Sequence, residues 1–135
     1  MRTLRGGTVK RKMWIFLNNA FLSIVAPERD EHNLIVRARV KGDIQRVFPR
    51  ARVVETPKAD YRFRASISRD TVATAIAKFV IYELDYTNFK NSIPKDKDGD
   101  KRHSAYTEVW NVMAKAFGRG LYNHPNRREK NGSSS

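Results

Sequence analysis

Two short stretches of the chain decide its fold: residues 34–40, LIVRARV, and residues 61–67, YRFRASI. In both stretches apolar and polar side chains alternate, which is the two-residue period of a β-strand with one buried face. The polar positions hold four arginines: Arg37, Arg39, Arg62 and Arg64. Tyr61 shares the apolar face of its stretch with Phe63. The pattern predicts a sheet with one apolar face and one face lined by arginine.

Three further strands complete the predicted sheet. Residues 13–17 and 21–25 are apolar runs separated by Asn18-Asn19, a pair that tolerates the left-handed backbone of a tight hairpin. Residues 51–55 form another short run, bounded by turn-forming residues. The expected sheet therefore has about five strands and is mainly antiparallel.

Helices are expected in three places. Asp43 is a candidate cap for a short helix ending at Phe48, because Pro49 disfavours its continuation. A longer helix, capped by Ser68 and ending near residue 84, has apolar residues around much of its circumference and is predicted to be central and buried.

The last helix is expected to follow a charged loop at residues 94–103, with Ser104 as its cap and Gly118 near its end. Its apolar residues recur at helical spacing, which predicts a core-facing stripe. The stripe comprises Tyr106, Val109, Trp110, Met113 and Phe117.

Length and composition favour one α+β domain with two basic ends. The chain has 135 residues, 40% of them hydrophobic, which is enough for a core. Residues 1–12 and 119–135 are basic and poor in apolar residues, so we predict a flexible extension and a disordered tail. The folded domain is predicted to span residues 13–118, with two longer helices and one short helix.

Charge and cysteine content narrow the classes of partner. There are 27 basic and 14 acidic residues, a net charge of +13, which favours anionic partners. Cysteine is absent, which excludes disulfides and thiolate chemistry and fits a reducing compartment, so a cytoplasmic location is expected. The apolar run at residues 13–25 is interrupted by two asparagines, which argues against a membrane span or signal peptide.

The arginine-lined face is the candidate binding site. Guanidinium groups hold phosphates and stack on bases, and aromatic residues on the same sheet supply further stacking surfaces. The candidate site comprises Arg37, Arg39, Arg52, Arg62, Arg64, Trp14 and Phe16. RNA or DNA is the partner expected on these grounds. The alternative is an ordinary solvated face whose arginines pair with acids and whose Trp14 lies in the core under the last helix.

No catalytic centre, metal site or cofactor is predicted. Asp96, Asp98 and Asp100 surround Gly99 as in part of a calcium loop, but the glycine falls too early for that pattern and neighbouring lysines offset the charge. Binding to nucleic acid without catalysis is therefore the leading hypothesis. A small enzyme would need a centre that the sequence does not supply.

Several segments together resemble a group of small bacterial and phage proteins that have no assigned activity. These are MWIFLNNAFLSIV from residue 13, LIVRARVKGDIQRVFP from residue 34, TPKADYRFRA from residue 56 and AYTEVWNVM from residue 105. The resemblance spans about residues 13–114, and its members usually start at the equivalent of Met13. It implies no activity or cofactor. It leaves a second hypothesis, a protein-interaction module such as a phage-related inhibitor or regulator.

Overall fold

The computed structural model of the chain describes residues 11–85 and 89–118. The chain divides into two compact units, residues 1–87 and residues 88–135, and each is described by itself.

The predicted flexible extension and the predicted disordered tail lie outside the described residues, apart from residues 11 and 12. The division between the two units falls inside the span of residues 13–118 that the sequence predicts as one domain. The independent folding of that span remains a prediction.

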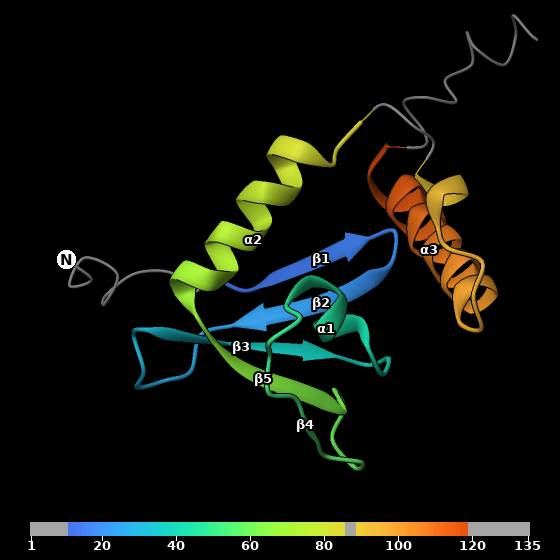
Figure 1. The fold of residues 1–135 in the computed structure, drawn as a ribbon. Helices are drawn as coiled ribbons and strands as arrows, with labels where there is room; N and C mark the ends of the chain where they lie inside the picture. Colours follow the sequence, from blue (N-terminus) through green and yellow to red (C-terminus); the bar gives the residue numbers. More distant parts are fainter. Residues whose placement is uncertain (1–10, 86–88, 119–135) are drawn as a thin grey trace, which may run out of the picture. The chain divides into compact units, whose positions relative to one another are not determined.

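The first unit is built on a five-stranded antiparallel sheet, which confirms the predicted α+β class (Figure 1). The strands are β1 (Met13–Leu17), β2 (Ala20–Val25), β3 (Asn33–Ala38), β4 (Val54–Glu55) and β5 (Phe63–Ser68). Their order across the sheet is β1-β2-β3-β5-β4, so β3 is central and β1 and β4 are the edges. Two α-helices of this unit, α1 (Asp43–Val47) and α2 (Arg69–Tyr82), follow β3 and β5.

The β1–β2 hairpin has the predicted position but not the predicted turn backbone. Leu17 pairs with Ala20, so Asn18 and Asn19 form a two-residue connection. No described residue other than glycine has a positive φ, and neither asparagine is left-handed. Predicted strands 34–40 and 51–55 are shorter in the structure, because β3 ends at Ala38 and β4 begins at Val54.

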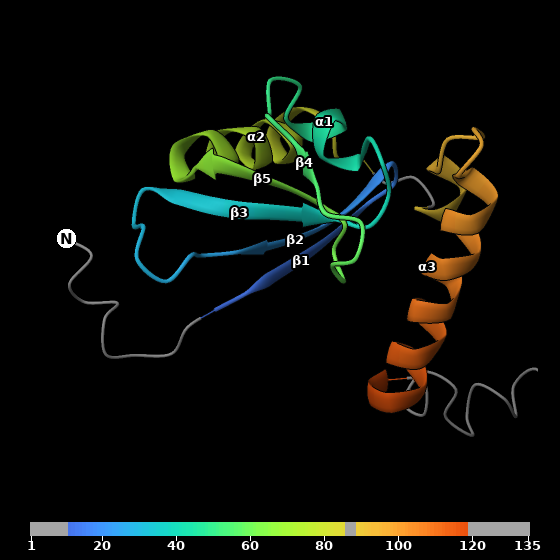
Figure 2. The ribbon, with the colours of Figure 1, turned by 90° about the horizontal axis from the view of Figure 1, so that it is seen from below.

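One face of the sheet holds the core, and α1 and α2 both lie on that side (Figure 2). Val36 at the centre of β3 is fully buried and pairs with Ile24 of β2 and Ala65 of β5. Ile44 and Phe48 bring α1 into the same cluster. Alternation along the strands thus places one series of residues, which is apolar, under the helices. The alternating polar residues of the central strands lie on the opposite face.

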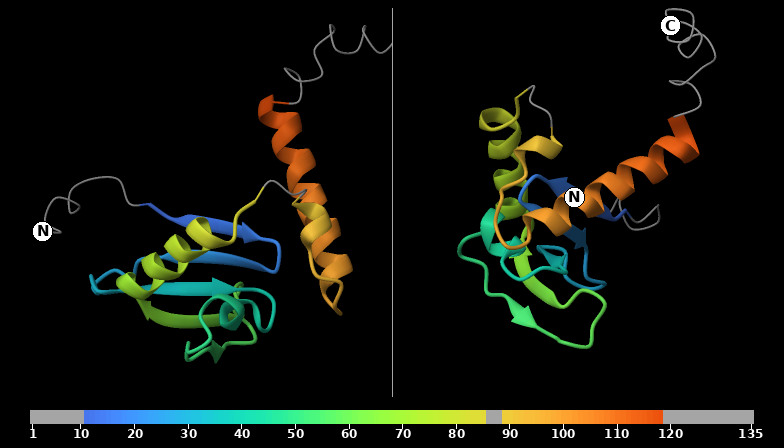
Figure 3. Two further views of the ribbon diagram at one scale, coloured as in Figure 1. Left: turned by 45° about the horizontal axis from the view of Figure 1, so that its top comes forward. Right: turned by 90° about the vertical axis from the view of Figure 1, so that its right-hand side faces the viewer.

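Helix α2 begins where the sequence predicts but is not a buried central helix. The Ser68 hydroxyl accepts a hydrogen bond from the Thr71 backbone N–H at 3.1 Å, which confirms the predicted cap. The helix crosses the strands obliquely (Figure 3), and only Val72 is fully buried. Ile81 and Tyr82 at its end are 67% and 77% exposed, so the prediction of burial around the circumference is wrong.

Asp43 does not cap α1, contrary to the prediction, but fastens α1 to the hairpin. Gly42, with φ of 95°, occupies the cap position. The completely buried Asp43 carboxylate accepts hydrogen bonds from the Phe21 backbone N–H at 3.0 Å and from Arg46 at 3.0 Å. Arg46 also donates to the Asn19 carbonyl oxygen at 3.2 Å. A buried charge is stable here because its hydrogen bonds replace the lost water.

The second unit is helical. It contains η2 (Lys90–Ser92), α3 (Gly99–Met113) and a turn of π-helix, η3 (Ala114–Gly118). Ser104 lies inside α3, so its predicted capping role is wrong, and the predicted loop at residues 94–103 is helical from Gly99 onward. A Cβ on Gly99 would lie 2.2 Å from the Pro94 carbonyl oxygen, which explains glycine at this start.

Most of the predicted core stripe of this helix is exposed. Tyr106 is buried at 7% exposure, and it stacks on Phe89 with ring centroids 5.7 Å apart. Trp110 is 56% exposed and Phe117 is 75% exposed, so the described part of the second unit does not itself provide a core for them. Helical spacing shows which residues share a side of a helix, but not whether another element covers that side.

The anchoring role of Asp43 gives a stability prediction. Asp43→Ala should lower the free energy of unfolding by about 3 kcal/mol, because it leaves the Phe21 amide and the Arg46 guanidinium without their buried acceptor. Urea denaturation followed by circular dichroism measures this loss. Asp70→Ala, which removes an exposed acid in the first turn of α2, is the control and should cost about 0.5 kcal/mol. Equal losses for the two variants would contradict the assignment.

Candidate nucleic-acid interface

The face of the sheet opposite α2 carries a row of paired residues that crosses all five strands. Trp14 of β1 pairs with Ser23 of β2, and Ser23 pairs with Arg37 of β3. Arg37 pairs with Arg64 of β5, which in turn pairs with Val54 of β4. Trp14 and Arg64 are three strand spacings apart, about 14 Å. We call this side the arginine face and define it by Trp14, Phe16, Phe21, Ser23, Arg37 and Arg64.

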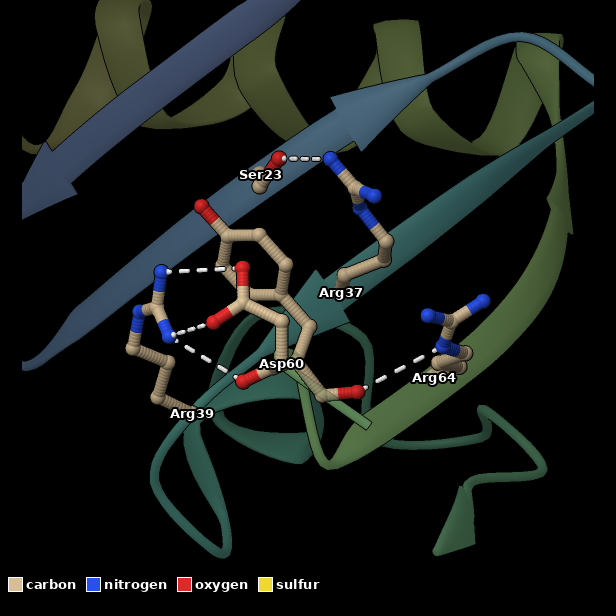
Figure 4. A network of polar contacts seen from close by, with 6 residues as sticks. Ser23, Arg37, Arg39, Asp60 and Arg64 are labelled. Atoms are coloured by element: carbon tan, nitrogen blue, oxygen red, sulfur yellow. Dashed lines mark hydrogen bonds and ion pairs between the residues drawn. The ribbon is translucent and has the colours of Figure 1, made fainter. Parts of the chain in front are cut away.

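Arg37 is held in place at the centre of the row (Figure 4). Its terminal nitrogen donates a hydrogen bond to the Ser23 hydroxyl at 2.7 Å. Its guanidinium carbon lies 4.4 Å from the centre of the Tyr61 ring, within the range of a cation–π contact. Its Nε atom is buried without a hydrogen-bond partner. Arg37 is therefore a preoriented cation whose position is set by β2 and by the aromatic ring.

Arg39 lies over the same tyrosine ring but also forms an ion pair with a neighbouring carboxylate. Its guanidinium carbon is 4.2 Å from the Tyr61 ring centre. The group donates to the Asp60 carboxylate at 2.6 Å and to the Asp60 carbonyl oxygen at 3.0 Å. Hydrogen bonding to Arg39 lowers the pKa of Asp60, and the same bonding raises the pKa of Arg39. A phosphate that approached Arg39 would have to compete with this carboxylate.

The position of Tyr61 differs from the sequence-based prediction. Alternation with Phe63 would put Tyr61 on the core face, but β5 begins only at Phe63. The Tyr61 ring instead lies beneath Arg37 and Arg39, and the residue is only 5% exposed. Strand alternation holds only within the paired segment, and Tyr61 lies outside it.

The β1–β2 end of the arginine face is aromatic. Trp14 is 65% exposed and lies outside the hydrophobic core of the first unit. The Trp14 and Phe21 rings pack edge to face with centroids 5.9 Å apart. The centroids of the Phe21 and Phe16 rings are 4.6 Å apart. The sequence analysis missed Phe21, although a two-residue turn at Asn18-Asn19 already implies that residues 16 and 21 are paired.

The remaining predicted arginines occupy three different environments. The Nε of Arg64 donates to the Tyr61 carbonyl oxygen at 3.4 Å, and this side chain forms no ion pair with a carboxylate of the described residues. Arg62 donates to Glu55 at 2.7 Å, so it is paired at the β4 edge as the solvated-face alternative expects. Arg52 lines a groove on the α2 side, with residues of the core face, and does not belong to the arginine face.

The described part of the chain has neither a cluster of potential metal ligands nor a membrane-spanning helix. Residues 11–85 and 89–118 contain no group of three His, Cys, Asp or Glu residues that could hold a metal ion. No helix within those residues is long and apolar enough to cross a membrane.

No protein-family model, curated protein or solved structure matches the chain. The geometry of the arginine face is therefore the basis for assigning a function.

The Arg39–Asp60 pair gives a prediction about pH. Because the pKa of Asp60 is lowered in the folded state, its contribution to stability is present above its unfolded value of about 3.9 and is lost as the pH falls through the folded value. Arg39→Met should raise the pKa of Asp60 toward that ordinary value. Carboxyl chemical shifts followed by NMR through an acid titration measure this change.

Asp30 is the internal control for the same titration. Its pKa is lowered by hydrogen bonds from the Asn33 side chain and the His32 backbone, so it should not respond to Arg39→Met. An Asp60 titration that is the same in the parent and the variant would show that Arg39 does not hold this carboxylate in solution.

Proposed function

We propose that this protein is a non-enzymatic module that binds single-stranded nucleic acid on its arginine face. The observation that carries the proposal is the register, which places the exposed Trp14 in one row with Arg37 and Arg64. An exposed indole on a sheet is a stacking surface for a base, and guanidinium groups in the same row are partners for the adjoining phosphates. The absence of cysteine fits cytoplasmic nucleic acid as the partner.

The three residues have different roles in this proposal. Trp14 stacks on a base, and this contact is open to any sequence because every base has a π face. Arg64 contacts phosphate, since its only hydrogen bond to a described residue is the long one from Nε to Tyr61. Arg37, which Ser23 and the Tyr61 ring hold in place, adds positive charge between the other two.

Single strands are favoured over duplexes by the geometry of stacking. A base can lie flat on Trp14 only when it is not stacked inside a helix. The net charge of +13 attracts any polyanion, and the basic ends of the chain contribute to that charge. The test must therefore separate stacking from general electrostatic attraction.

Trp14→Ala separates the two contributions. The variant should bind an oligouridylate or oligothymidylate about 5- to 150-fold more weakly, because one base loses its stacking partner. The dependence of affinity on salt should stay unchanged, since no charge is removed. Fluorescence of Trp14 in a Trp110→Phe background measures binding to the parent sheet, and anisotropy of a labelled oligonucleotide compares the variants. Affinity within twofold of the parent would contradict the proposal.

Arg64→Gln should change both quantities. Removing one phosphate contact should weaken binding and reduce the slope of log affinity against log salt by about 0.7 for a single strand. Arg29→Gln is the matched control, because it removes one charge from an exposed residue in the loop between β2 and β3. If both variants reduce affinity and slope equally, general charge accounts for binding and the arginine face is not a site.

A further inference from the structure

The other side of the sheet contains a groove that the proposed function does not use. It has a volume of about 1150 Å³ and lies among the core face of the sheet, α2 and the segment that follows α1. Its apolar walls include Ile15 and Leu17 of β1, Phe79 and Val80 of α2, and Leu84 just beyond the helix. The groove is therefore separated from the arginine face by the thickness of the sheet.

The oblique path of α2 accounts for the groove. The helix is fastened to the core by Val72, with Ala75 and Ile76 partly buried against the same cluster. Beyond that point Val80 is 54% exposed and Leu84 is 62% exposed. Within the first unit, the β1 end of the core face is thus covered incompletely. Exposed apolar residues that continue into a groove are typical of an interaction site rather than of ordinary surface.

The charges around the groove favour an acidic partner. Arg46, Arg50, Arg52 and Lys78 line it, against Asp70 and Glu83. Arg46 is already bound to the buried Asp43. Within the described residues, Arg50, Arg52 and Lys78 form no ion pair. Asp70, Lys78 and Glu83 belong to α2 and its C-cap, whereas Arg50 and Arg52 follow α1, so the cationic edge of the groove is the one formed by these two arginines.

We propose that this groove binds an amphipathic helix with acidic flanks, supplied by a partner protein. Its volume exceeds the roughly 300–1000 Å³ of ordinary small-molecule pockets, and an apolar groove with charged edges is the surface on which one face of a helix docks. A second copy of this chain is disfavoured as the occupant, because its net charge of +13 opposes the cationic rim. An added strand would need a sheet edge, whereas this groove lies over the face.

The direct test uses three synthetic peptides and the full chain. The first peptide is an 18-residue amphipathic helix with leucines at helical spacing and glutamates on both flanks. The second has the same composition in scrambled order, and the third has glutamine in place of glutamate. The acidic amphipathic peptide should bind at least tenfold more tightly than either control and should gain helical circular dichroism. Equal binding of the scrambled peptide would overturn the proposal, because charge alone would then suffice.

Substitutions locate the binding. Arg52→Gln with Lys78→Gln should weaken binding of the acidic peptide at least tenfold, and Leu84→Ser should weaken it without a change in charge. Arg29→Gln with Lys58→Gln is the charge-matched control, taken from exposed residues outside the groove. Leu84 is exposed enough for its variant to remain folded, which circular dichroism checks. Peptide binding that is unaffected by the groove variants would overturn the assignment.

A competing ligand tests the alternative occupant. Oleate has an apolar chain and one carboxylate, so it represents a small amphiphile that the same chemistry would attract. The proposal expects micromolar oleate, below its micellar range, to leave peptide binding unchanged. Displacement of the peptide by oleate, together with saturable oleate binding that Leu84→Ser abolishes, would assign the groove to a lipid-like ligand instead.

Discussion

The register of β3 in the centre of the sheet is the constraint on which the rest of the structure depends. Val36 has no exposed surface and is paired on both sides, with Ile24 and Ala65. A shift of one residue would turn Val36 outward and bring Arg37 under the helices, where an unpaired guanidinium is costly. Burial of a single apolar face therefore also determines that Arg37 lies on the opposite face.

Two chemically different surfaces follow from this one sheet. The arginine face combines aromatic rings with cations, and its central cation is held by Ser23 and Tyr61. The α2 side combines apolar walls with a cationic rim, because α2 crosses the sheet obliquely and covers only part of it. A short polar network centred on Asp43 keeps α1 against the hairpin at the edge of this groove. The two surfaces lie on opposite sides of the sheet, so they can be tested separately.

Ion pairing divides the four arginines that first pointed to a binding surface. Arg39 and Arg62 have carboxylate partners at 2.6 Å and 2.7 Å, as expected for a solvated face. Arg37 and Arg64 instead lie in the transverse row with Trp14. A count of basic residues would treat all four alike. Their surroundings separate two arginines that have a carboxylate partner from two that share a row with an exposed indole.

Local sequence patterns were sufficient to predict those elements that depend on interactions between residues close together in the chain. The bounds of β1, the position of the Asn18-Asn19 turn and the Ser68 cap follow from alternation, turn preference and a hydrogen bond between near neighbours. The fold class follows from the same signals. Tyr61, Asp43 and the start of α3 were misjudged, because strand ends, distant hydrogen-bond partners and close backbone contacts are not encoded by spacing alone.

The sequence by itself thus determined the α+β class, most strands, the cap of α2 and the presence of an arginine-rich face. Only the tertiary structure decided which residues share that face. It put Trp14 and Arg64 in one row from strands 50 residues apart in the chain, and it moved Arg52 to the other side. The physical reason is that alternation specifies two faces for each strand separately. Pairing between strands and burial beneath the helices are needed to join those faces into a surface.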